Sequence, residues 1–178
     1  VFGFFKNYLN KNDEVLSTYA EHASLILPFY EIDSKIKFIE LENNLLTFDN
    51  LKKSITKNTK VIAISHVTNV LGDIRPIKKI CEYAHKNNIL VLVDASQSAP
   101  HLKIDVQDLD VDFLVFSAHK MLGPTGVGIL YAKKELLDNV KPTVFGGGMN
   151  ISFNKDGSKE YNSLPHLLEA GTPNIAGV

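Results

Sequence analysis

The stretch Phe113-Leu114-Val115-Phe116-Ser117-Ala118-His119-Lys120 decides the fold and raises the question of function. Four apolar residues in a row are typical of a strand buried on both faces, so the polar residues that follow would lie where that strand ends. A lysine at the carboxyl end of a buried strand can be dehydrated enough to act as an amine nucleophile and to form a Schiff base with an aldehyde cofactor. Ser117 and His119 can donate hydrogen bonds to an anion beside Lys120. A single lysine is more often simply solvated, so the interpretation depends on the rest of the chain.

Strands and helices alternate on both sides of this stretch. Pro76 stands at a favoured first-turn position, and the apolar residues after it recur at the spacing of one helix face: Ile77, Ile80, Cys81 and Ala84. A second helix is predicted over 48–56. Apolar runs predict strands over 14–18, 36–41, 60–65, 89–93, 112–117 and 127–132. This alternation predicts an α/β fold, with a mainly parallel sheet flanked by helices. The polar segment 150–163 is predicted to be a long surface loop.

The composition limits the classes of protein to consider. With 178 residues, of which 44% are hydrophobic, the chain can bury a sizeable core, and we expect one domain. The net charge of −1 comes from well-mixed acidic and basic residues, so neither nucleic acid nor a membrane surface is expected as a partner. The single cysteine, Cys81, excludes a disulfide framework and favours a reducing compartment; it lies on an apolar helix face and is interpreted as a core residue. We expect a cytoplasmic protein, and an organelle fits equally well.

Several other classes of site find no support in the sequence. No apolar run reaches the length of a transmembrane helix, and no signal peptide opens the chain. The six histidines lack metal-binding spacing, so no metal site is predicted. The glycines at 146–148 do not form a nucleotide-binding fingerprint. Because the chain begins with Val1 and the segment 171–178 stops without a closing helix, we expect an internal piece of a longer protein.

Polar clusters follow three of the predicted strands: 65–69, 94–97 and 117–120. Ligands of parallel α/β sheets bind beyond the carboxyl ends of the strands, so the three clusters are expected to meet at one edge. Pyridoxal phosphate (PLP) would suit such a site, because its aldehyde needs an amine and its protonated ring nitrogen needs a carboxylate. Lys120 and Asp94 are the candidates. Taken alone, Asp94 would more often be a helix cap or a loop acid.

Further residues could complete the cofactor site. Asn69 and Gln97 could donate hydrogen bonds to the phenolic oxygen of PLP. His22 could stack on the face of its ring, although a lone histidine is more often a surface or capping residue. The loop 123–126 could shape the surroundings of Lys120, or it could be an ordinary turn.

With these residues assembled, the chain resembles the large domain of a class V aminotransferase-family enzyme, of the fold-type I PLP-dependent transferases. More narrowly, it is similar to the SufS-type cysteine desulfurases, a group that includes selenocysteine lyases. The resemblance runs from end to end, and it rests on five segments: Glu21-His22, 65–72, 93–97, 117–120 and 169–174. The chain departs from the common family pattern by small changes at five positions: Ala23, Leu25, Ala95, Ser96 and Ala118.

The resemblance implies a role for each site residue. Lys120 would bind PLP and act as a base, while His22 would stack on the ring. Asp94 would hold the pyridine nitrogen. Asn69 and Gln97 would contact the phenolic oxygen. Phosphate would be held by Ser117 and His119 of one subunit and by Thr172 of its neighbour, which implies a homodimer with shared active sites.

The resemblance also implies an activity: removal of sulfur from L-cysteine, giving L-alanine and an enzyme persulfide. A SufE- or SufU-like acceptor would receive the sulfur for iron–sulfur cluster assembly. Residues 1–178 would then be part of the PLP-binding large domain. An amino-terminal phosphate-binding segment and a small carboxy-terminal domain, with the nucleophilic cysteine and a substrate-binding arginine, would lie outside it, so the fragment alone is expected to be inactive. The alternatives are a selenocysteine lyase, another class V aminotransferase or epimerase, and a truncated, non-catalytic partner domain.

Overall fold

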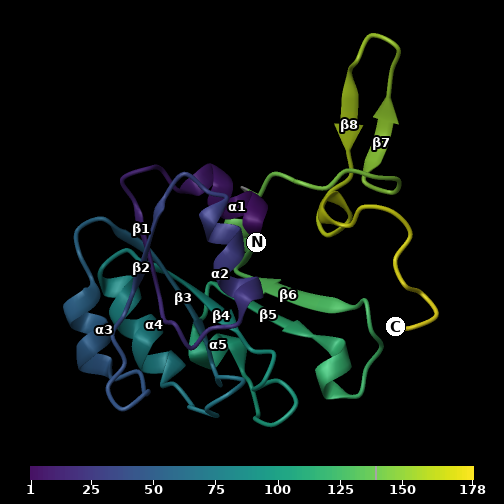
Figure 1. The fold of residues 1–178 in the computed structure, drawn as a ribbon. Helices are drawn as coiled ribbons and strands as arrows, with labels where there is room; N and C mark the ends of the chain where they lie inside the picture. Colours follow the sequence, from purple (N-terminus) through teal and green to yellow (C-terminus); the bar gives the residue numbers. More distant parts are fainter. Residues whose placement is uncertain (139) are drawn as a thin grey trace.

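A six-stranded sheet forms the centre of the protein. The structure is a computed structural model that describes residues 1–138 and 140–178. The strands lie in the order β2-β1-β3-β4-β5-β6 (Figure 1), and only β6 runs antiparallel to its neighbour. The strand bounds are β1 (Glu14–Ser17), β2 (Lys35–Phe38), β3 (Thr59–Ser65), β4 (Leu90–Asp94), β5 (Phe113–Ser117) and β6 (Gly128–Ala132). The predicted α/β fold with a mainly parallel sheet is confirmed.

Helices cover both faces of this sheet. The α-helices are α1 (Phe2–Tyr8), α2 (Ala23–Tyr30), α3 (Phe48–Ser54), α4 (Ile77–Lys86), α5 (Val106–Leu109) and α6 (Lys134–Leu137). The side chains of β3 alternate between two hydrophobic clusters, as the period of a strand requires. Ile62 and Ile64 pack in the cluster that contains residues of α3 and α4, whereas Val61 and Ala63 pack with residues of α1 and α2. Alternate burial therefore fixes which helices lie on which face.

The strongly patterned elements form where the sequence predicts them. In α4 the four apolar residues of the predicted face are buried, and the helix ends before Asn87. Helix α3 begins after Thr47, whose hydroxyl accepts a hydrogen bond from the backbone of Asn50 (3.2 Å). Helices α1, α2, α5 and α6 were not predicted. Helices α1, α5 and α6 are short, and α2 contains Pro28, a residue that ordinarily argues against a helix interior.

Strand β2 lies at one edge of the sheet, paired only with β1 in the described part of the chain. The sequence predicts a strand over 36–41, and the strand observed is shorter and begins one residue earlier. Its two lysines, Lys35 and Lys37, are exposed and alternate with the half-buried Ile36 and Phe38. This alternation is typical of an edge strand that packs one face.

The segment 150–163 corrects a prediction. It is a β-hairpin rather than a loop, with β7 (Asn150–Phe153) paired antiparallel to β8 (Lys159–Tyr161). The hairpin projects away from the six-stranded sheet (Figure 1). Gly157 takes the positive φ that its tight turn needs, and Asp156 accepts a hydrogen bond from the backbone of Ser158 (2.9 Å). Its polar composition concealed the strands because most of their side chains are exposed. A short 3-10 helix, η2 (His166–Leu168), follows.

None of the described helices combines the length and the apolar character needed to cross a membrane.

Candidate active site

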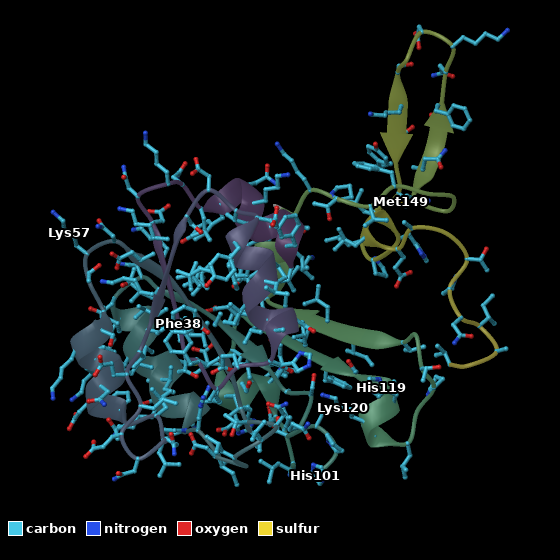
Figure 2. The ribbon with its side chains drawn as sticks, in the orientation of Figure 1. Phe38, Lys57, His101, His119, Lys120 and Met149 are labelled. Carbon is cyan, nitrogen blue, oxygen red and sulfur yellow. The ribbon has the colours of Figure 1, made fainter. Side chains whose placement is uncertain are left out.

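A tight turn after β5 presents Lys120 at the carboxyl edge of the sheet. The turn is a 3-10 helix, η1 (Ala118–Met121), that ends with Leu122 in the left-handed conformation. The backbone N–H of Gly123 donates to the carbonyl of Ala118 (2.9 Å). A side chain at Gly123 would lie 2.9 Å from that carbonyl oxygen, so only glycine fits. The chain then returns as β6, which places Lys120 and His119 together at the end of this two-stranded unit (Figure 2).

A pocket of about 330 Å³ lies beside Lys120 and collects five of the eight predicted site residues. They come from three separate elements: His22 from the start of α2, Asp94 from β4, and Ser117, His119 and Lys120 from the end of β5 and η1. The sequence therefore predicts this convergence correctly, because all but His22 follow a buried parallel strand. Ser24 and Ser96 also line the pocket and were not predicted. Each stands two positions after a predicted residue, which is the signal that could have found them.

Asp94 combines both interpretations of its side chain. One carboxylate oxygen, Oδ1, accepts a hydrogen bond from the backbone N–H of Ser96 (2.8 Å) and so stabilises the turn after β4. No hydrogen bond to Oδ2 is found among the described residues, and Asp94 lines the pocket. Asp94 can therefore stabilise the turn and also serve as a ligand-binding carboxylate. The carboxylate is held in a fixed orientation with one oxygen left for a ligand.

His22 also has a structural bond and a free side. It is the N-cap of α2, where its ring Nδ1 accepts a hydrogen bond from the backbone N–H of Ser24 (3.2 Å). A neutral ring in this position carries its proton on Nε2. The ring is consequently fixed at the pocket, with a donor available on the side away from the helix.

Asn69 lines a second cavity of about 450 Å³, which adjoins the first because both are lined by His22. Gln97 and Thr172 line neither of these two cavities. Gln97 is half-buried, and its backbone carbonyl lies 2.7 Å from Nδ1 of His101. Thr172 is exposed, in the terminal segment that follows the hairpin. This single chain thus brings six of the eight predicted residues to two adjoining cavities.

The interpretation of Cys81 as a core residue is confirmed. Its thiol is buried in the cluster behind β3 and β4, and burial raises its pKa to about 12.

No group of three or more metal-ligating side chains is found among residues 1–138 and 140–178. The chemistry of the pocket therefore rests on an amine, a carboxylate, two imidazoles and hydroxyls.

Comparison with known proteins identifies the family. A sequence model described as "Aminotransferase class-V" matches residues 2–178. The chain belongs to the class-V aminotransferase family. Among curated members, a protein named "Probable cysteine desulfurase" from Halalkalibacterium halodurans is 44% identical over 174 residues, which are 95% of this chain and 43% of that protein. The chain thus spans less than half the length of this relative.

Solved structures of the family show the same fold. The cysteine desulfurase CsdA from Escherichia coli superposes with a TM-score of 0.91 at 36% identity, over 98% of this chain and 45% of that one. A C-DES mutant with glycine covalently linked to its PLP cofactor has a TM-score of 0.80 at 25% identity, over 93% of this chain and 46% of that one. The donor set of the pocket fits PLP, because Lys120 offers an amine, Asp94 a free carboxylate oxygen, and Ser117 and His119 donors for phosphate.

Proposed function

We propose that this chain is part of the PLP-binding large domain of a cysteine desulfurase, which removes sulfur from L-cysteine to give L-alanine and an enzyme persulfide. The observation that carries the proposal is the pocket in which Lys120 and Asp94 meet. The similarity to named desulfurases, at 44% and 36% identity, supports this reaction among those of the family. Each of these relatives is more than twice as long as the aligned part, so we place a small carboxy-terminal domain and an amino-terminal segment outside residues 1–178.

The residues of the pocket would divide the binding of PLP among them. The Lys120 amine would bond to the aldehyde, and the free oxygen of Asp94 would pair with the protonated ring nitrogen. Ser117 and His119 would donate to the phosphate. Asn69 and Gln97 would donate to the phenolic oxygen, and Thr172 would reach the phosphate of a partner subunit. When bound, PLP supplies an electron sink for carbanion chemistry at the substrate α-carbon.

Two side chains would then move or hold protons. As a free amine beside the substrate α-carbon, Lys120 would take the α-proton as a base. His22 would pack on the cofactor and donate from Nε2, since its Nδ1 is bonded to Ser24. A cysteine thiolate from outside residues 1–178 would attack the substrate sulfur. A persulfide S–S bond would form there as the Cβ–S bond breaks. Its electron pair would stay with Cβ, which would take up a proton, and the α-carbon would regain a proton from Lys120 to give alanine.

Partners and location follow from the same proposal. A homodimer would bring Thr172 of one subunit to the pocket of the other. A SufE- or SufU-like acceptor would take the persulfide sulfur for iron–sulfur cluster assembly. A cytoplasmic location is supported by the single cysteine of the chain, which suits a reducing compartment.

The deciding experiment measures sulfide released from L-cysteine, with reductant, by the protein from its complete reading frame. Wild-type protein should release sulfide and show the visible absorbance of lysine-bound PLP, and Lys120→Ala should lose both. Lys57→Ala is the matched control, because Lys57 is exposed and lies on the far side of the sheet from Lys120 (Figure 2). Visible absorbance without sulfide release would assign the protein to another class V reaction. Full activity of Lys120→Ala would refute the site itself.

A further inference from the structure

Two deeply buried charges lie beside the candidate active site, because Glu21 precedes His22 and lines the second cavity. Glu21 and Arg75 form an ion pair in which the two side chains are 0% and 1% exposed. Burying two charges is costly, and an apolar pair of similar volume often gives equal stability. Such a pair therefore calls for an explanation other than stability. Neither residue was predicted as a site residue, since they are 54 positions apart in the sequence.

Glu21 ties the turn before α2 to the end of β3. Its Oε2 accepts a hydrogen bond from the backbone N–H of Ser65 (2.7 Å) and another from the Ser65 hydroxyl. Its Oε1 accepts from the Thr18 hydroxyl (2.6 Å) and from Nη1 of Arg75. Both carboxylate oxygens are thus bonded to separate segments. His22, the next residue, inherits a fixed position from these bonds.

Arg75 ties in the loop that carries Asn69. Its Nη2 donates to the Thr18 hydroxyl (3.0 Å), and its backbone N–H donates to the carbonyl of His66 (2.9 Å). Between these ends the loop closes on itself, because the hydroxyl of Thr68 accepts a hydrogen bond from the backbone N–H of Asp73 (3.0 Å). The guanidinium therefore anchors a closed loop, with exposed Asn69 within it, against the turn that carries His22.

We propose that Glu21 and Arg75 act together as positioning residues, which hold His22 and Asn69 in register on the two adjoining cavities. Neither residue lines the pocket of Lys120. Glu21 is among the residues that line the second cavity, but its side chain is 0% exposed, so the pair acts through the segments it joins. This inference rests on the proposed function, because its test measures sulfide release and the circular dichroism of bound PLP. The Glu21–Arg75 ion pair thus sets the geometry of the site rather than the stability of the fold.

The test uses a double variant, Glu21→Leu with Arg75→Met, in the complete PLP-loaded protein. Removing both charges together avoids the fully buried unpaired charge that a single substitution would leave. Asp73, whose Oδ2 lies 3.5 Å from Nε of Arg75, loses this partner, but it is 14% exposed and still accepts a hydrogen bond from the backbone N–H of Leu46 (3.4 Å), so the double variant is expected to fold. It should melt close to the wild-type temperature and keep lysine-bound PLP. Its kcat for sulfide release should nevertheless fall about 10- to 100-fold, because displacements of about 1 Å at a reacting centre cost that much. The visible circular dichroism of PLP should change as the His22 ring moves.

A matched control separates positioning from general destabilisation. Lys133→Met removes another partly buried ion pair, between Lys133 and Asp112 (3.0 Å), at the opposite edge of the sheet. It should lower the melting temperature but leave kcat and the visible circular dichroism of PLP at wild-type values. The proposal is overturned if the double variant keeps both properties, or if Lys133→Met loses kcat equally. Should wild-type protein release no sulfide, the circular dichroism comparison still decides the positioning role independently of the reaction.

Discussion

Two side chains at the pocket each use one polar atom for a hydrogen bond to the backbone and keep a second polar atom for a ligand. His22 caps α2 through Nδ1 and keeps Nε2 for the pocket. Asp94 bonds the turn after β4 through Oδ1 and keeps Oδ2. A reacting group held in this way needs no reordering when a ligand arrives. The bonds to the backbone therefore support the chemistry instead of competing with it.

The buried thiol of Cys81 is expected to be unreactive. Burial, followed by the nearby carboxylates of Asp112 and Asp110, raises its pKa to about 12. The thiolate fraction at pH 8 is then about 1000-fold lower than for a thiol of ordinary pKa near 9. Native protein treated with iodoacetamide should leave the Cys81 peptide unmodified by mass spectrometry, and protein in urea should be modified fully. Rapid labelling of Cys81 in the native protein would contradict its place in the core.

At this scale the sequence predicts groups that follow a buried strand and misses groups that meet only after folding. Lys120 and Asp94 were predicted because each lies in the short polar segment that follows an apolar run. The pairing of Glu21 with Arg75 depends on the packing of two distant loops, and no local pattern indicates it. Thr172 was identified through family resemblance alone.

Among the elements, the ends of β4 and β5 opposite the pocket are joined by a charged cluster. His85 contacts Asp110 (3.0 Å) and Asp112 (2.9 Å) through its two ring nitrogens, and Lys133 contacts the same two carboxylates. Asp112 also accepts a hydrogen bond from the backbone of Val91 (2.7 Å). This cluster joins α4 to both strands and to the chain after β6, at the edge remote from the site.

The cluster predicts a pH-dependent contribution to stability. The hydrogen bond from Lys133 holds the pKa of Asp110 below its ordinary value of 3.8. A carboxylate with a lowered pKa stabilises the folded state above its unfolded pKa, and that gain is lost as pH falls through the lower folded pKa. Asp110→Asn should therefore lower the urea midpoint at pH 7. Because Asp110 is 55% exposed and solvent screens the pair, we expect at most about 1 kcal/mol.

Urea titrations from pH 7 down to pH 3 measure this effect. The difference between wild type and Asp110→Asn should shrink once the pH drops below about 4 and should also shrink in high salt. A difference that stays constant across this range would show that the Asp110 charge contributes nothing.

Elements were predictable in proportion to their burial. Strands β3 and β4 and helix α4 bury whole faces, so hydrophobic periodicity located them to within one or two residues. The hairpin of β7 and β8 buries little, and its pattern is mostly polar. Helix α2 is stabilised by its His22 cap and by Leu25 and Phe29 against the sheet, contacts that outweigh Pro28.

For the whole molecule, the proposed sharing of sites between subunits makes a quantitative prediction. Lys120→Ala protein lacks the amine, and Thr172→Val protein should bind PLP phosphate more weakly in the partner's site. In a hybrid dimer of the two, one pocket combines Lys120 from the second variant with Thr172 from the first. That pocket is wild type, so mixing after reversible dissociation should restore activity above that of either variant.

The control is a mixture of Thr172→Val with wild type lacking PLP, which shows how far subunits exchange. A mixture of the two variants that exchanges subunits but gains no activity would place Thr172 in the same subunit's site, or in none.

The lysines of β2 have a consequence for the behaviour of the protein in concentrated solution. A strand at the margin of a sheet offers unpaired backbone groups, which can recruit a strand from another chain and start aggregation. Lys35 and Lys37 place two positive charges along this margin, of which that of Lys37 is partly balanced by Glu14 (3.5 Å), so an identical chain approaching it meets like charge mainly at Lys35. The sheet is consequently protected against fibril-like growth at one end by charge repulsion.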